Sequence, residues 1–194
     1  MDFSSFRKVE NGVNELFVNR WSARAMSGEK VSKKDLMSLF EAARWAPSSS
    51  NEQPWRFIYV LKERKKWKDF FSLLDSGNQT WIKNAGALIV VISKKIWEED
   101  GSINETASFD TGAAWENIAL QGSLNGLVIH GLAGFNYQKM REMLNLNEDY
   151  KVEMMIAVGK PGKIEDLPDK YKEREKPNGR NELSEFVFEE EFRR

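Results

Sequence analysis

Two short stretches of this 194-residue chain carry side chains that could bind a ligand. The first is the segment NRWSARAM, in which Arg20 and Arg24 flank the hydroxyl of Ser22. Two guanidinium groups beside a hydroxyl can hold a phosphate through charge-assisted, bidentate hydrogen bonds. A solvated loop explains the same residues, since the chain has 29 lysines and arginines in all. This segment alone does not decide between the two interpretations.

The second stretch is WAPSSSNEQPWRFIYV, residues 45–60, where neutral polar side chains gather between two prolines. Their hydroxyl and amide groups could read the uncharged edge of a heterocycle, and the prolines limit the backbone entropy lost on binding. The alternative is a loop that ends a helix and leads into a strand, with both tryptophans in the core. The polar residues are Ser48, Ser49, Asn51 and Gln53, and the prolines are Pro47 and Pro54.

Three further positions are weaker candidates. The amide of Asn78 could pair with the C=O and N–H groups of a heterocycle, or it could cap a helix. His130 lies in a strand-like segment, which is more typical of a structural histidine than of a base. Gly134, in HGLAGF, permits a close backbone approach or simply a turn. Neither of the common glycine-rich phosphate loops occurs in the sequence.

The composition excludes several classes of chemistry. The chain has no cysteine, so disulfides, thiolate nucleophiles and cysteine-ligated metals are absent. It has one histidine, which cannot form a histidine metal cluster. An enzyme of this composition would therefore take its reactive group from a bound organic cofactor. The formal net charge of −1 gives no reason to expect nucleic acid or a membrane as a partner.

The hydrophobic pattern predicts the elements that would position these residues. The run at 87–92 is apolar without alternation, as in a strand covered on both faces, and small residues in 106–124 suggest a central, tightly packed helix. The polar segment 160–182 is long for an internal loop. We expect helices at 6–19, 32–46, 67–74, 106–124 and 137–144, and strands at 56–61, 87–92, 127–133, 152–158 and 183–188.

The tract KERKKWKDFFSLL could be read as a nucleic-acid patch, because a tryptophan interrupts its lysines. However, Trp67, Phe70, Phe71 and Leu74 recur at helical spacing. The basic residues are more simply the solvated face of a helix.

In their order along the chain, these segments resemble the FMN-dependent nitroreductase family. The likeness extends from about Glu15 to Val187, and its most specific part is the block A-P-S-x-x-N-x-Q-P-W. The other segments that carry it are Arg-x-Ser-x-Arg, GNQTWIKNAGALIVVI, NGLVIHGLAGF, IAVGKPG and GRNELSEFV.

The resemblance implies a role for each matching position. Arg20, Ser22 and Arg180 would hold the FMN phosphate, and Arg24 would lie toward the ribityl chain and the pyrimidine end. Asn78 would read the edge of the isoalloxazine ring. The residues that would line the flavin from the partner subunit are Pro47, Ser48, Ser49 and Asn51.

Three cofactor-binding positions depart from the family pattern. Trp21 stands where many relatives have a second basic residue, and Asn178, two before Arg180, often corresponds to lysine or arginine. Both changes thin the positive charge around the phosphate. Ala133 replaces a glycine or acidic residue, which leaves the contact near flavin N5 to the backbone N–H of Gly134.

The resemblance also implies the fold and the activity. The fold would be α+β, nitroreductase-like, with a central, mainly antiparallel sheet flanked by helices. We expect one domain over residues 1–194, with a C-terminal arm from about residue 160 exchanged in a homodimer. The activity would be ping-pong hydride transfer from NADH or NADPH through FMN to an organic acceptor such as a nitroaromatic or quinone.

Three alternatives stay open at this point. The chain could be a non-catalytic protein that binds a flavin or another small ligand, a dehalogenating or flavin-fragmenting member of the same fold, or a nucleic-acid module. The N-terminus lacks the apolar region of a signal peptide, and the longest apolar run is too short to span a bilayer. We therefore expect a cytoplasmic protein.

Overall fold

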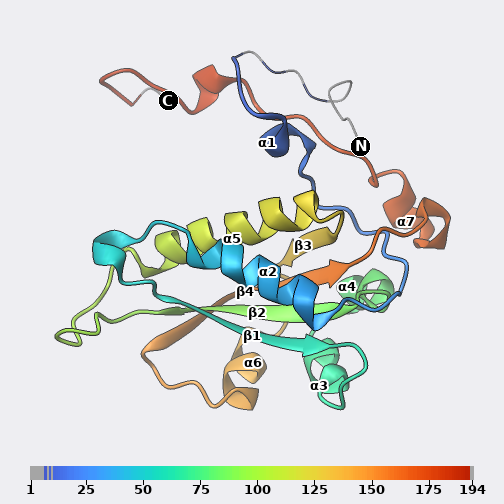
Figure 1. Ribbon diagram of the computed structural model, residues 1–194, viewed down its shortest axis with the longest axis horizontal. Coiled ribbons are helices and arrows are strands. Elements are labelled where there is room, and N and C mark those ends of the chain that lie inside the picture. The colour runs from blue at the N-terminus through green and yellow to red at the C-terminus, as the bar shows by residue number, and fades with distance from the viewer. Residues whose placement is uncertain (1–6, 8, 10, 193–194) are drawn as a thin grey trace.

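The computed structural model describes residues 7, 9 and 11–192 of the chain (Figure 1). Its centre is a four-stranded antiparallel sheet with the strand order β1-β2-β4-β3. The strands are β1 (Trp55–Leu61), β2 (Ala87–Lys94), β3 (Val128–Leu132) and β4 (Tyr150–Gly159). The predicted α+β class and the antiparallel sheet are confirmed.

Strand β2 is buried along its whole length, as its unbroken apolar run predicts. Its side chains alternate between two hydrophobic cores, because successive residues of a strand point to opposite faces. Leu88, Val90 and Ile92 contribute to one core, whereas Ile89 and Val91 contribute to the other. The sheet is therefore covered on both sides.

Helices form a layer on each face of the sheet. On one face lie α2 (Lys33–Arg44) and α5 (Ala107–Leu124), whose apolar residues pack on the core that contains Ile89. Figure 1 shows these two helices side by side across the strands. The helices that contribute to the opposite core are α3 (Trp67–Ser72), α4 (Ser76–Ile82) and α6 (Tyr137–Met143).

The start of α2 follows from its sequence. Ser32 accepts a hydrogen bond from the backbone N–H of Asp35 at 3.0 Å, and the carboxylate of Asp35 accepts one from the N–H of Ser32 at 3.1 Å. This capping box satisfies two N–H groups that the first turn of a helix leaves without partners. The predicted start of this helix is confirmed.

Helix α5 approaches the sheet closely because the side chains on its buried face are small. A Cβ atom on Gly122 would come within 2.1 Å of Ile129 in β3, so only glycine fits there. Ala114 and Ile118 are buried as expected, but Leu124 is 65% exposed. Leu124 is the last residue of the helix.

The tract after β1 forms the solvated helix that its spacing predicts. In α3, Trp67 and Phe70 are buried and Lys68 is exposed, while Arg64, Lys65 and Lys66 are exposed in the turn just before the helix. The remaining predicted helices and strands are found with small differences at their ends, except at the two termini.

The predicted first helix is wrong over most of its length. Helix α1 spans only Glu15–Asn19, and Val9 and Val13 are exposed and not helical. Asn14 has an extended backbone, and its side chain accepts a hydrogen bond from the N–H of Leu16, which starts the helix there. The predicted contribution of Phe6 lies outside the described residues.

The segment after β4 packs against its own chain. It contains the short helix α7 (Asp169–Lys172), and the Tyr171 hydroxyl donates a hydrogen bond to the carbonyl of Gly77 at 2.9 Å. Pro161 forms a β-bridge with Met26. An exchanged arm would therefore begin later than the predicted residue 160, beyond these internal contacts.

The predicted strand at 183–188, which was expected to reach the sheet of a partner subunit, does not form within the single chain. Leu183–Glu185 form a 3₁₀ turn, in which the N–H groups of Phe186 and Val187 bond to the carbonyl of Leu183. The alternating pattern gives a strand only where a neighbouring strand accepts its hydrogen bonds, and here the turn satisfies them locally.

Among the described residues, no helix is both long and apolar enough to span a bilayer.

Candidate functional site

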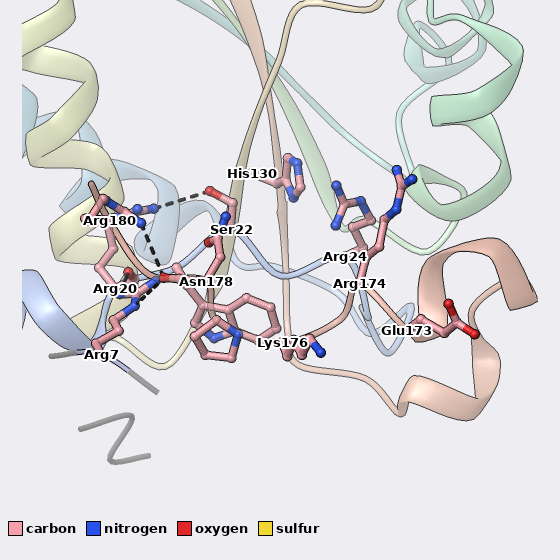
Figure 2. Close-up of a pocket in the computed structure, with 12 residues that line it drawn as sticks. Arg7, Arg20, Ser22, Arg24, His130, Glu173, Arg174, Lys176, Asn178 and Arg180 are labelled. Carbon is pink, nitrogen blue, oxygen red and sulfur yellow. Dashed lines mark hydrogen bonds between the residues drawn. The ribbon is translucent and has the colours of Figure 1, made fainter. Parts of the chain in front are cut away.

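A basic cavity of about 570 Å³ lies between the loop that follows α1 and the segment that follows α7 (Figure 2). His130, at the middle of β3, adds to its wall. Five of the predicted site residues line it, namely Arg20, Trp21, Ser22, Arg24 and Arg180. The others that line it are Arg7, His130, Glu173, Arg174, Lys176, Pro177 and Asn178.

One end of this cavity carries the predicted phosphate ligands. The Nη1 atom of Arg20 donates a hydrogen bond to the hydroxyl of Ser22 at 3.3 Å. Arg180, 158–160 residues later in the chain, lines the same cavity and donates to the carbonyl of Gly179 at 2.9 Å. Figure 2 shows the three side chains at the same end of the cavity. The fold thus brings together two cations and a hydroxyl, a donor set that suits an anion.

Arg7 belongs to this end of the cavity and was not predicted. Its side chain is buried, with 8% of the residue exposed, and its Nη1 atom donates to the carbonyls of Val18 and Arg20. Its Nε atom donates to the carbonyl of Asn178 at 3.1 Å. Burial and the nearby charges of Arg180 and Arg20 lower the pKa of Arg7. No sequence motif marks this residue.

The other end of the cavity is organised by a buried carboxylate, Glu175, that the sequence also did not reveal. Its Oε1 atom accepts hydrogen bonds from the backbone N–H groups of Arg24 and Ala25, at 2.6 and 2.7 Å. Its Oε2 atom lies 4.0 Å from the guanidinium of Arg24. That guanidinium also lies over the rings of Tyr171 and Trp81, at 5.5 and 6.0 Å from their centroids. Arg24 is therefore held in place on several sides.

His130 lines the cavity between its two ends and is neutral. Its Nδ1 atom is 2.8 Å from the carbonyl of Ala23, which places the ring proton on Nδ1, and its ring lies 4.7 Å from that of Trp81. Burial above all, opposed by the hydrogen bond to Ala23 and assisted by the charges of Arg24 and Arg20, lowers the pKa of His130 from 6.5 to about 4. At neutral pH the imidazole carries no charge.

Asn78 and Gly134 lie against each other outside the wall of this cavity. The Nδ2 atom of Asn78 donates a hydrogen bond to the carbonyl of Gly134 at 3.0 Å. A Cβ atom on Gly134 would come within 2.5 Å of that nitrogen and 2.7 Å of Asp75 Oδ2, so this contact requires a glycine. Ala133, the preceding residue, is exposed.

The polar hinge at 47–51 lies apart from both groups, at the start of α5. The backbone N–H of Ser49 donates to the buried carboxylate of Asp110 at 3.1 Å. Ser50 and Asn51 have left-handed φ angles of 49° and 57°, a strained conformation that occurs most often at functional sites. Pro47, Ser48, Ser49 and Asn51 do not line the basic cavity. The interpretation of both tryptophans as core is wrong for Trp45, which is 73% exposed, and Trp55 alone is buried.

A second, more apolar cavity of about 900 Å³ adjoins the basic one and shares three of its residues, Trp21, Lys176 and Pro177. Its wall runs along the inner side of α1 and the C-terminal half of α5. Ala119, Leu127 and Val128 contribute apolar surface to it. The basic cavity suits an anionic group, and the neighbouring cavity suits an apolar group.

Comparison with known proteins gives consistent results. The family described as "Nitroreductase family" matches residues 18–160. A protein of Archaeoglobus fulgidus named "Putative NADH dehydrogenase/NAD(P)H nitroreductase" is 30% identical over 159 residues, covering 76% of this chain and 84% of that protein. The iodotyrosine deiodinase of Thermotoga neapolitana is 26% identical over 174 residues, covering 76% of this chain and 87% of that protein.

A solved structure, described as the crystal structure of the oxidoreductase containing FMN, superimposes on this chain with a TM-score of 0.92. The two sequences are 42% identical, and the match covers 96% of each chain. The fold and the family expected from the sequence are thereby confirmed.

Proposed function

Because the chain belongs to the nitroreductase family, we propose that it is an FMN-dependent oxidoreductase that uses NADH or NADPH to reduce a small organic acceptor. The relative's name points to nitro compounds as acceptors, and quinones are the other class that the family resemblance suggests. The observation that carries the proposal is the convergence of Arg20, Ser22 and Arg180 on one end of a basic cavity whose wall also includes Arg24.

The phosphate of FMN suits the basic end of the cavity. It is a dianion, and it needs donors with positive charge close by. Arg20 and Ser22 are already aligned by their own hydrogen bond, so little side-chain freedom is lost when an anion binds. Arg180 supplies a second guanidinium at the same end of the cavity. The donor set therefore fits the group in charge and in hydrogen-bonding type.

The uncharged ring of FMN needs apolar surface and a few amide groups. Trp21 lines the basic cavity together with Arg24 and would contact the ligand there. Arg24, held by Glu175, would place a cation toward the pyrimidine end. Asn78 bonds to Gly134 through Nδ2, which leaves its amide oxygen for the ring edge.

We propose that the rest of the site comes from a second copy of the chain. The hinge residues Pro47, Ser48, Ser49 and Asn51 lie away from the basic cavity of their own chain and would line the ring in the partner's site. Exposed apolar side chains give the two copies a surface on which to associate. The large ones near the termini and α5 include Val13, Phe17, Phe109, Leu124, Leu183 and Phe186.

When bound, FMN supplies hydride chemistry that no side chain of this protein provides. The chain's own residues bind and orient the group: Arg20, Ser22 and Arg180 fix one end, and the backbone N–H of Gly134 would lie near N5. We propose that NAD(P)H and the acceptor occupy the same pocket in turn. Double-reciprocal plots of the initial rate against NADPH concentration, at several fixed acceptor concentrations, should then give parallel lines. Intersecting lines would exclude this ping-pong mechanism.

The visible spectrum of the purified protein tests the proposed function. We expect flavin absorption bands that bleach when NADPH or NADH is added under argon and return when a quinone or nitroaromatic is added. Flavin bands that neither nucleotide bleaches would favour a non-catalytic flavin-binding protein. A protein that neither carries FMN nor takes it up would contradict the proposal.

One relative favours a second candidate activity. The Thermotoga neapolitana protein is named a deiodinase, so reductive dehalogenation is a reaction to test beside nitro and quinone reduction. Faster turnover of an iodinated phenol than of any quinone or nitroaromatic would favour that candidate.

A further inference from the structure

The basic end of the cavity is assembled from two segments that are far apart in the sequence. Arg20 and Ser22 lie in the loop after α1, whereas Arg180 lies in the segment after α7. The positions of Arg20 and Arg180 relative to each other decide whether both can reach one anion. A single side chain, Arg7, contacts both segments.

Arg7 joins the two segments through its planar guanidinium group. One nitrogen donates to the carbonyls of Val18 and Arg20, and Nε donates to the carbonyl of Asn178, two residues before Arg180. Figure 2 shows Arg7 beside Arg20 and Asn178. The five donors of arginine lie in a rigid plane, so a group with three carbonyl acceptors fixes their relative positions.

The position of Arg7 is unfavourable unless an anion is near. Its side chain is buried, it lies close to the like charges of Arg20 and Arg180, and its Nη2 atom has no hydrogen-bond partner among the described residues. A buried cation without a neutralising charge destabilises a fold. A dianion bound between Arg20 and Arg180 would reverse the sign of that interaction. Docking of Arg7 and binding of the anion would therefore favour each other.

We propose that Arg7 is a positioning residue of the phosphate site, which clamps the Arg20 and Arg180 segments together and adds the positive charge that Asn178 does not supply. This inference rests on the proposed function for the identity of the ligand, but it also applies to any phosphate bound at this end. It predicts an effect on affinity for the phosphate group in particular, and not for the ring.

The first test compares two ligands that differ only in the phosphate. Flavin-free protein is titrated with FMN and with riboflavin, for the wild type and for Arg7→Gln. We expect Arg7→Gln to weaken FMN binding by about tenfold or more, since hydrogen bonds to charged groups are of that size, and riboflavin binding by less than about threefold. A residue with only a structural role would weaken both ligands equally.

The second test uses inorganic phosphate alone. Phosphate should raise the thermal midpoint of the flavin-free wild type, and this increase should be lost or much reduced in Arg7→Gln. Arg141→Gln is the matched control. Arg141 also donates to two backbone carbonyls, those of Tyr150 and Asn147, but it joins α6 to β4 away from the cavity. We expect Arg141→Gln to lower the midpoint and to keep the full phosphate-dependent increase.

The conservative variant Arg7→Lys keeps the charge and loses the planar group, and it serves if Arg7→Gln does not fold. It should weaken FMN binding by about threefold or more and leave riboflavin binding unchanged. An unchanged ratio of FMN to riboflavin affinity in the variants, with FMN bound tightly by the wild type, would overturn this inference and leave the proposed function standing. If the wild-type protein does not bind FMN but phosphate stabilises it through Arg7, the proposed function would be contradicted and this inference would stand.

Discussion

The carboxylate of Glu175 holds the backbone of Arg24, whose N–H lies 2.6 Å from Oε1. The same oxygen accepts from the N–H of Ala25, and 6% of Glu175 is exposed. One buried side chain therefore attaches the segment after α7 to the loop that carries the basic cavity.

Glu175→Leu should be strongly destabilising because it leaves the buried N–H of Ala25 and the partly buried N–H of Arg24 without acceptors. At about 1–3 kcal/mol for each group, the free energy of unfolding should fall by about 2–6 kcal/mol. Glu175→Gln keeps an acceptor and should cost less than half as much. Urea denaturation measures the free energy of unfolding of both variants. The control is Glu165→Leu, at an exposed position. Equal stability of the Leu and Gln variants would show that these hydrogen bonds do not support the loop.

Gly134→Ala should disturb the position of Asn78. The added Cβ would lie 2.5 Å from Asn78 Nδ2 and 2.7 Å from Asp75 Oδ2, so at least one of these side chains must move. We expect a loss of about 1–3 kcal/mol in stability, as for other overpacked sites, and weaker binding of both FMN and riboflavin. Gly12→Ala, where no atom lies within 4 Å of the new Cβ, should change stability by less than about 0.5 kcal/mol. Wild-type riboflavin affinity in Gly134→Ala would remove Asn78 from the ring site.

His130 should make stability depend on pH below neutrality. Its pKa is about 4 in the folded chain, against an ordinary value of 6.5. Between these values the unfolded chain binds a proton that the folded chain does not, so stability is full above pH 6.5 and falls as the pH falls toward 4. The loss attributable to His130 should reach about 3 kcal/mol at most.

The variant His130→Gln cannot ionise, so its stability should change less over the same pH range. The rate of flavin reduction should change by less than about tenfold, whereas loss of a general acid or base costs at least about a hundredfold. Parallel pH–stability curves for the two proteins would contradict the low pKa. A larger loss of rate with FMN fully bound would make His130 catalytic.

The last residues of the chain should be needed for both association and cofactor binding. A chain that ends at Pro177 lacks Arg180 and the exposed apolar residues Leu183 and Phe186. We expect the full chain to be a homodimer at low micromolar concentration by light scattering, and the shortened chain to lose both the dimer and FMN. A chain that ends at Phe188 is the control and should retain both. A monomeric, FMN-loaded full chain would contradict the shared site.

The sequence predicts best those features that depend on local pattern. The apolar run of β2, the capping box at Ser32 and the spacing of Trp67 and Phe70 each specify an element with few alternatives. The first helix was predicted wrongly, and the strand at 183–188 does not form within the single chain, because a short-range pattern does not show which hydrogen-bond partners the fold provides. Asn14 and Leu183 decide those two segments through local hydrogen bonds.

The candidate site was predictable in part for the same reason. Arg20, Ser22 and Arg24 stand in one recognisable segment, and the structure places them on one cavity. Arg7 and Glu175 are ordinary charged residues in sequence, and only burial among backbone acceptors and donors distinguishes them. No spacing rule could have indicated either residue.

The central claim is that Arg20, Ser22 and Arg180 hold the phosphate of FMN, and the dissociation constant of FMN for Arg20→Ala tests it most directly. Equilibrium titration of the flavin-free protein should show FMN binding weakened by about 1.5–3 kcal/mol, the usual size of a hydrogen bond to a charged group, with riboflavin binding little changed. An FMN dissociation constant equal to that of the wild type would contradict the account and place the cofactor elsewhere.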